Sequence, residues 1–319
     1  MRRRHFSLIA LLLLILLVSG LGWPLYAAPA QNGNGTRADH PSVPVGPIFY
    51  TDSENNCLVR IDDMTGKNKV TYGTEGKGIG QFSYPEGICT DRKGRIYIAD
   101  TLNNRVVRID DMKGKNWITV SKIPDSTTVT GYQEIGGPDN VYVDSHDRIY
   151  VVGNDRVVRM ADMTAKKWEI LGGFFFAQAV CTDRQGHIYI ADRAHCQIVR
   201  VDDMKGNHYK VLKTPCGPQS ISIDSQQRLW IAALDSDHTN TVTTILRVDD
   251  ITGRNRLSAT TNIYGDQKTY RVRHICLGKE EGSIYMLDEG NSRLVYVNAL
   301  TGEGWSTLKA CETGSIFVR

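Results

Sequence analysis

The stretch RIYIADTLNNRVVRIDDMKGKNW, residues 95–117, contains two runs of alternating apolar residues, with a polar turn between them and a second turn after them. Alternation with a period of two predicts half-buried strands. The first run recurs in segments that begin at residues 48, 96, 149, 188, 229 and 284, and the second in segments that begin at 58, 106, 157, 198, 245 and 294. The second turn recurs as MTGKN, MKGKN, MTAKK, MKGNH, ITGRN and LTGEG. The chain therefore contains six copies of one unit.

A third short strand precedes five of the six copies, as GICTD, NVYVD, AVCTD, SISID and HICLG. The first copy lacks this strand, but SIFVR at residues 315–319 can supply it from the far end of the chain. With an outer strand after the second turn, each unit has four strands at a period of roughly 40 to 55 residues, which is typical of a propeller. The sequence predicts an all-β fold: a six-bladed β-propeller of four-stranded antiparallel blades, closed by the C-terminal strand joining the first blade.

The segment GKGIGQFSYPEGICTDRKGRIYIADTLNNRVVRID, residues 76–110, resembles an NHL repeat in its glycine-rich lead, its QFSYPEG and its ADTLNNR. The resemblance covers residues 45–319, which we expect to form the propeller, after a signal peptide at residues 1–30 and a polar linker at residues 31–44. Proteins of this family include extracellular sensor domains, protein- and RNA-binding modules, copper- or zinc-dependent amidating lyases and distant calcium-dependent lactonases. We interpret Asp100, Asn103 and Asn104 as residues that satisfy backbone groups of the turn.

The first thirty residues resemble a bacterial export signal: three arginines, a long apolar run and the small residues AAPA. Cleavage after Ala30 would leave an exported protein that is periplasmic, secreted or on the cell surface, and an uncleaved signal would be its membrane anchor. The whole chain has 38 basic and 35 acidic residues, and the signal contains three arginines and no acid, so the remainder is neutral. We therefore expect a monomer that does not bind nucleic acid.

The mouth of the channel is the predicted ligand site, because the loops entering the innermost strands gather there. The residues two positions before the first apolar residue of each such strand are Glu86, Asp139, Gln178, Gln219, Arg273 and Gly314. Two carboxylates and two amide oxygens could hold calcium, with Glu86 and Asp139 as the metal ligands. Arg273 would oppose a cation and favour an anionic ligand, and the adjacent His274 belongs to the same predicted site.

A zinc site is the rival, because His195, His238 and His274 all fall in loops on this face of the last three blades. Only His274 stands at the start of an innermost strand, where the resemblance to the amidating lyases would place several histidines. The long insertion ALDSDHTNTVTT in the fifth unit adds Asp235 and Asp237 as candidate ligand contacts.

The seven cysteines divide into two groups by position. Cys89, Cys181 and Cys276 occupy equivalent places in innermost strands, where they are expected to be small core residues. The other four lie in loops, and an oxidising compartment would allow Cys57 to pair with Cys311 and Cys196 with Cys216.

These patterns predict an exported binding or sensor scaffold whose mouth takes a protein, peptide, glycan or small ligand. The alternative is a metal-dependent lyase or lactonase that uses calcium or zinc. The sequence contains no nucleophile elbow of the form Gly-x-Ser-x-Gly and no paired Cys-x-x-Cys motif.

Overall fold

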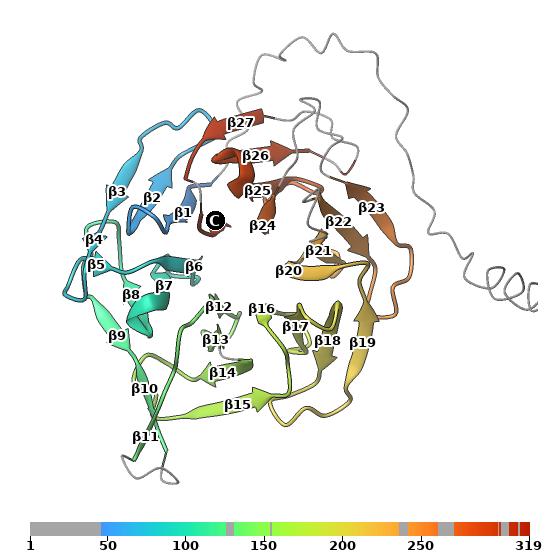
Figure 1. Ribbon diagram of the computed structural model, residues 1–319, viewed down its shortest axis with the longest axis horizontal. Helices are drawn as coiled ribbons and strands as arrows, with labels where there is room; N and C mark the ends of the chain where they lie inside the picture. The colour runs from blue at the N-terminus through green and yellow to red at the C-terminus, as the bar shows by residue number, and fades with distance from the viewer. Residues whose placement is uncertain are drawn as a thin grey trace, which may run out of the picture.

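The computed structural model describes residues 46–125, 131–153, 155–235, 242–260, 271–298, 300, 306–311 and 313–319. These residues form six four-stranded antiparallel sheets, arranged radially around a central channel (Figure 1). The predicted six-bladed β-propeller is confirmed. Within the described part of the chain, no helix has the length and apolar character needed to span a membrane.

The strands of each blade follow one another from the channel outwards. Blade 1 contains β28 (Ile316–Val318), β1 (Ile48–Asp52), β2 (Cys57–Ile61) and β3 (Val70–Tyr72). Blade 2 contains β6 (Pro85–Thr90), β7 (Ile96–Asp100), β8 (Arg105–Ile109) and β9 (Ile118–Val120). Blade 3 contains β12 (Asn140–Val143), β13 (Ile149–Gly153), β14 (Arg156–Met160) and β15 (Trp168–Gly172).

Blade 4 contains β16 (Ala177–Thr182), β17 (Ile188–Asp192), β18 (Gln197–Val201) and β19 (Lys210–Lys213). Blade 5 contains β20 (Gly217–Ile223), β21 (Leu229–Asp235), β22 (Val242–Val248) and β23 (Leu257–Thr260). Blade 6 contains β24 (Val272–Leu277), β25 (Ile284–Asp288), β26 (Arg293–Val297) and β27 (Ser306–Lys309). Two small pairs lie outside the blades: β4 (Thr74–Glu75) with β5 (Gln81–Phe82), and β10 (Lys122–Pro124) with β11 (Tyr132–Glu134).

The ring is closed by β28, which pairs antiparallel with β1 so that Val318 lies opposite Ile48 and Ile316 opposite Tyr50. The apolar side chains of this blade then pack against blade 6, in a cluster that contains Tyr50 and Leu287. Equivalent clusters fill the space between the other neighbouring blades. A single blade cannot bury both of its faces, so the closed ring is the unit that buries the core.

In blades 2, 4 and 6 a buried aspartate at the end of the second strand fixes the loop that enters the blade. Asp100, at the end of β7, accepts hydrogen bonds from the Ser83 backbone N–H (2.7 Å), Asn103 Nδ2 (2.9 Å) and Arg105 Nε (2.6 Å). Asn104 takes a left-handed conformation with φ of 52° at the end of the short helix η1 (Thr101–Asn103). Asp100 and Asn103 satisfy backbone groups as predicted, since Asn103 Nδ2 also donates to Gly76 O (2.8 Å).

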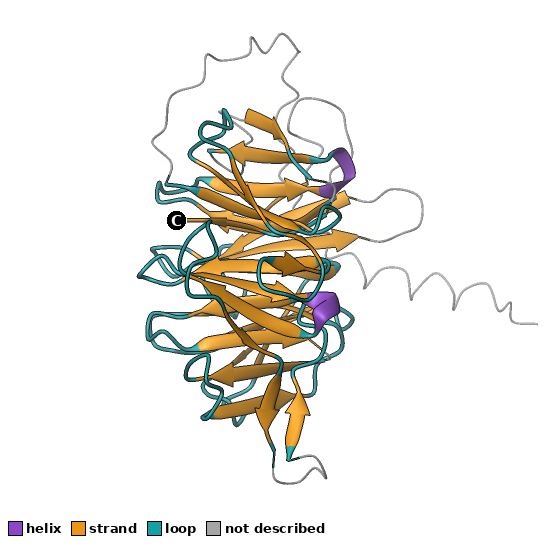
Figure 2. Cartoon of the chain, turned by 90° about the vertical axis from the view of Figure 1, so that its left-hand side faces the viewer, coloured by secondary structure: helices purple, strands orange, loops and turns teal. Residues whose placement is uncertain are grey.

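The two faces of the disc differ in what they present (Figure 2). Helices η1 and η3 (Glu289–Asn291) belong to the loops between second and third strands, and they lie at one edge of the side view. The C-terminus lies at the opposite edge. The face with the short helices is the predicted mouth.

Candidate binding site at the channel mouth

The predicted ring residues lie where the innermost strands leave regular pairing. The register shifts between Pro85 and Ile88 in β6, between Ala177 and Ala179 in β16, between Pro218 and Ser220 in β20, and between Val272 and His274 in β24. These shifts fall on Glu86, Gln178, Gln219 and Arg273. A bulge turns a side chain away from the sheet normal, and bulges are frequent beside functional sites.

Asp139 and Gly314 take the corresponding places in blades 3 and 1. The Asp139 backbone N–H donates to Val152 O (2.8 Å), although Val152 already lies opposite Asn140. At Gly314 an added Cβ would collide with the backbone of Thr51, so only glycine fits. Blade 1 therefore contributes no side chain to the ring.

Arg273 reaches across blade 1 to Glu86, which is 187 residues distant in sequence. Its Nη2 lies 3.0 Å from Glu86 Oε1 and 3.1 Å from Oε2, so one guanidinium nitrogen contacts both carboxylate oxygens. Nη1 lies 3.8 Å from Oε1 of Glu289, a residue of η3. This ion pair joins blades 6 and 2, which are not neighbours in the ring.

Asp139 completes the network from the other side of Glu86. Burial, followed by the negative charge of Glu86, raises the pKa of Asp139 to about 7, and the two carboxyl groups are hydrogen bonded to each other. Burial also raises the pKa of Glu86, although Arg273 opposes that shift. Two carboxyl groups that share a site do not both ionise easily, so the pair retains a proton close to neutral pH.

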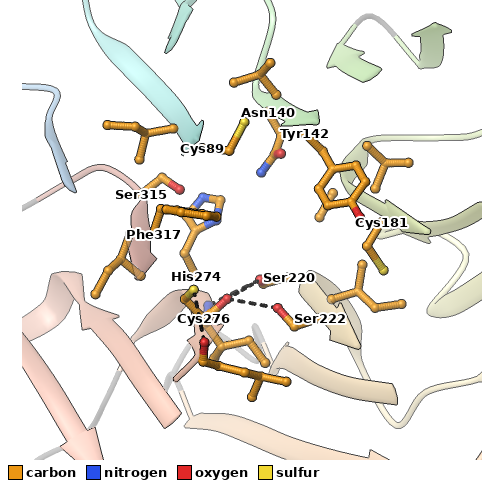
Figure 3. Close-up of a pocket in the computed structure, with 18 of the residues that line it drawn as sticks. Cys89, Asn140, Tyr142, Cys181, Ser220, Ser222, His274, Cys276, Ser315 and Phe317 are labelled. Carbon is orange, nitrogen blue, oxygen red and sulfur yellow. Dashed lines mark hydrogen bonds between the residues drawn. The ribbon is translucent and has the colours of Figure 1, made fainter. Parts of the chain in front are cut away.

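The channel below the mouth has a volume of about 230 Å³ and is lined by all six innermost strands. His274 projects into it toward Asn140 and Ser315 (Figure 3). Burial, and then the adjacent Arg273, lower the pKa of His274 to about 3, so its imidazole is neutral at physiological pH. Ser220 and Ser222 donate to Ile275 O, both at 3.4 Å, and line the same wall.

Among the described residues, no group of three or more His, Cys, Asp or Glu side chains is arranged so that it could hold a metal ion. Glu86 and Asp139 lie together, but Arg273 occupies the space beside Glu86. His195 Nδ1 lies 2.9 Å from Asp192 Oδ2, on a half-exposed loop. Asp237 and His238 fall outside the described residues, and Asp235 is the last residue of β21. Metal binding at this mouth stays a prediction.

All seven cysteines carry free thiols in the structure. Cys57 and Cys311 lie in the same buried cluster of blades 1 and 6. Thr214 forms hydrogen bonds with the backbone carbonyls of both Cys196 and Cys216. Its N–H donates to Cys196 O (2.9 Å), and its hydroxyl donates to Cys216 O (2.6 Å). Both proposed pairings stay predictions. Cys89 and Cys181 are buried, and burial raises the pKa of each thiol, as expected for core residues.

Two mouth residues are absent from the set predicted from the sequence, Arg193 and Glu289. Both directly follow the aspartate that ends a second strand, at the position that Thr101 takes in blade 2. Thr101 donates to Pro138 O (2.8 Å) and so bridges to the next blade. Comparing this position among the six copies would have found both charged residues, because the other four copies have the uncharged residues Ser53, Thr101, Asn154 and Ser236 there.

Comparison with known families and structures agrees with this architecture. Residues 82–109 match the NHL repeat family. A catalytically inactive virginiamycin B lyase from Staphylococcus aureus with quinupristin has 14% identity and a TM-score of 0.55, over 84% of this chain and 81% of that one. A chain of the nidogen/laminin complex has 12% identity and a TM-score of 0.62, over 86% of this chain and 98% of that one.

A protein of unknown function from Bacteroides caccae has 13% identity and a TM-score of 0.60, over 86% of this chain and 98% of that one. A search of curated protein sequences found no match. At these identities the solved structures establish the shared fold and leave the activity open.

Proposed function

Because the chain is a six-bladed NHL-repeat β-propeller, we propose that it is an exported binding or sensor scaffold whose channel mouth takes a protein, peptide, glycan or small-molecule ligand. One observation carries this proposal: four innermost strands are bulged at the residues that surround the mouth. Regular strands would close the ring equally well, so the bulges serve the side chains that they present.

The buried network adds support. Glu86, Arg273 and Glu289 are ionisable groups kept from water beside an open channel, and such groups cost free energy unless they are paired. Their arrangement provides a fixed pattern of donors and acceptors without requiring the protein to reorganise. A propeller in the nidogen/laminin complex has the same fold, which is consistent with protein binding by such a ring.

Ligand screening on the mature protein, residues 31–319, tests this proposal. Peptide and glycan arrays would identify ligands, and titration calorimetry would compare the parent with a Gln178→Ala, Gln219→Ala double variant. Gln185→Ala is the matched control, because Gln185 is exposed in the turn at the opposite end of the blade 4 strands. We expect the double variant to weaken binding about tenfold or more, as loss of two polar contacts implies. Equal affinity for all three proteins would place the ligand elsewhere.

A metal-dependent lyase or lactonase is the second candidate, favoured by the contact between Glu86 and Asp139 at the mouth. Metal content measured by mass spectrometry separates it from the scaffold. One equivalent of calcium or zinc, lost in a Glu86→Ala, Asp139→Ala variant, would support the enzyme. A metal-free protein that binds its ligand after chelation would refute it.

A further inference from the structure

Arg193 stands over the junction of blades 4 and 5 at the mouth. Its backbone N–H donates to Phe176 O (3.2 Å), which ties the loop after β17 to the loop before β16. Its Cγ lies 2.9 Å from the place that a Cβ of Gly217 would occupy. The side chain therefore rests on the start of β20, and it can do so because residue 217 is glycine.

The guanidinium of Arg193 is partly buried, and none of the side chains that the structure describes, which exclude that of Asp235, forms a hydrogen bond or an ion pair with it. Burial, and then the positive charges of Arg273 and Arg271, lower the pKa of Arg193. By contrast, the other two arginines have acidic partners. Arg273 forms ion pairs with Glu86 and Glu289, and Arg271 Nε lies 3.8 Å from Glu289 Oε2. A partly desolvated cation with no counter-ion among the described side chains is costly, so this site favours an incoming anion.

Amide groups lie beside this arginine. Gln219 donates through Nε2 to the carbonyl of Gly217 (3.4 Å), the residue on which Arg193 rests. Gln178 follows Ala177 at the start of β16, in the blade that carries Arg193. Both glutamines are at the bulges and can donate further hydrogen bonds from their amide groups.

Two exposed phenylalanines border the same sector. Phe175 and Phe176 are 54% and 58% exposed, with ring centroids 5.4 Å apart. Their backbone N–H groups donate to Asp192 Oδ1 (3.0 Å) and Asp155 Oδ1 (2.7 Å), which fixes the loop. Phe176 has φ of 55°, an unfavourable conformation for a bulky residue. The fold thus holds two largely exposed aromatic rings on the loop whose carbonyls accept from the backbone N–H groups of Arg193 and Ala194, and the Phe175 ring centroid lies 6.1 Å from that of His195.

We infer that the sector formed by Phe175, Phe176, Gln178, Arg193 and Gln219 binds a carboxylate group that carries an adjacent aromatic or apolar group. A guanidinium binds a carboxylate with two parallel hydrogen bonds, the glutamine amides can add more, and the phenylalanines cover the apolar part. This inference rests on the proposed function of the mouth and names the chemistry of its ligand. The free acid and the C-terminal residue of a peptide are two sources of the same chemistry.

Titration calorimetry on residues 31–319 tests the inference with four probes: N-acetyl-L-phenylalanine, its amide, the peptide Ala-Ala-Ala-Phe and its C-terminal amide. We expect each acid to bind about tenfold or more tightly than its amide, and salt to weaken only the acids. Tighter binding of the peptide than of the small acid would identify a chain terminus as the ligand, and the reverse order a free organic acid. Failure of both acids to bind, or equal binding of acid and amide, would overturn the inference.

Variants make the test specific. Arg193→Gln should weaken binding of the acids about tenfold while raising the melting temperature, because it removes a cation that is repelled by two others. Gly217→Ala should weaken binding with the arginine still present, by pushing its side chain off β20. Arg184→Gln, at an exposed arginine on the opposite face, is the control for binding and should leave the affinity for the acids unchanged. Unchanged affinity in Arg193→Gln would overturn the inference. If a screened ligand still depends on Gln178 and Gln219, the mouth remains the binding site and only its assigned chemistry fails.

Discussion

Single residues decide the electrostatics of the mouth. Arg273 neutralises Glu86 across blade 1, whose Gly314 contributes no side chain to the ring. Burial, and then the negative charge of Glu86, keep Asp139 protonated to a higher pH than an exposed aspartate, although Arg273 opposes this rise of its pKa. The consequence is a carboxyl pair that changes its charge close to neutral pH.

Asp139→Asn should therefore change how stability depends on pH. The pKa of Asp139 is about 7 in the folded protein, above its value of about 3.9 in the unfolded chain. Its stabilising contribution is complete below the unfolded pKa and is lost as pH rises through the folded pKa. Between pH 5 and pH 8 the parent should lose about 2 kcal/mol more unfolding free energy than the variant, measured by urea unfolding. Glu75→Gln, at an exposed position, is the control, and parallel profiles for parent and Asp139→Asn would contradict the assignment.

At the scale of the strand, one repeated turn fixes the far end of the innermost strands. Asp224 follows β20 and accepts hydrogen bonds from the backbone N–H groups of Gln226 (3.0 Å) and Arg228 (2.9 Å). Its second oxygen accepts from Arg228 Nε (2.7 Å) and Trp230 Nε1 (2.9 Å). Asp91, Asp144 and Asp183 make the same pattern in blades 2 to 4. In these blades, one carboxylate thus holds the first and second strands together, in addition to the backbone hydrogen bonds between the two strands.

Asp224→Ala should destabilise the protein by about 2–3 kcal/mol, because it leaves the indole N–H of the buried Trp230 without its acceptor. The difference in unfolding free energy between the parent and Asp224→Ala should become smaller at low pH. Burial of Asp224 alone would raise its pKa, but the hydrogen bonds from Trp230 and Arg228 outweigh this effect and lower the pKa. A lowered pKa gives stability that is present above the unfolded value and lost as pH falls. Denaturant unfolding measures both effects. Asp203→Ala, in an exposed turn, should change stability much less, and an equal loss there would refute this reasoning.

At the scale of the molecule, stability depends on closing the ring. β28 is three residues long, yet it supplies the innermost strand of blade 1 and contacts blade 6. Without it, blade 1 would expose the edge of β1 and half of an interblade cluster. A propeller tolerates such an edge poorly, because each blade depends on its neighbours.

Removal of residues 315–319 should abolish the single cooperative melting transition in calorimetry. Ile316→Ala, which keeps the strand, should lower stability by about 2–4 kcal/mol, as expected for truncation of a side chain that is 4% exposed. A truncated protein that melts as sharply as the parent would show that closure by β28 is dispensable.

The same closure makes the predicted Cys57–Cys311 pair testable. A bridge would join β2 to the segment just before β28, and so cross-link the two ends of the ring. Titration of the denatured, unreduced mature protein should then give three free thiols if both predicted pairs form. Seven free thiols would rule out both disulfides.

The sequence determined the architecture, because alternation within a strand and repetition along the chain are local properties that six copies report independently. The missing strand of the first copy and the extra strand at the C-terminus even predicted how the ring closes. The six mouth positions followed from the same alignment.

The tertiary structure alone decided what those positions do. The contact of Arg273 with Glu86 joins residues 187 apart in the sequence, and the bulges that position these two residues have no local signature in the apolar pattern. The same is true of Arg193, whose lack of a counter-ion among the described residues depends on which side chains the neighbouring blades bring near it. Strand periodicity fixes which face a residue occupies, whereas pairing between side chains depends on distances across the assembled ring.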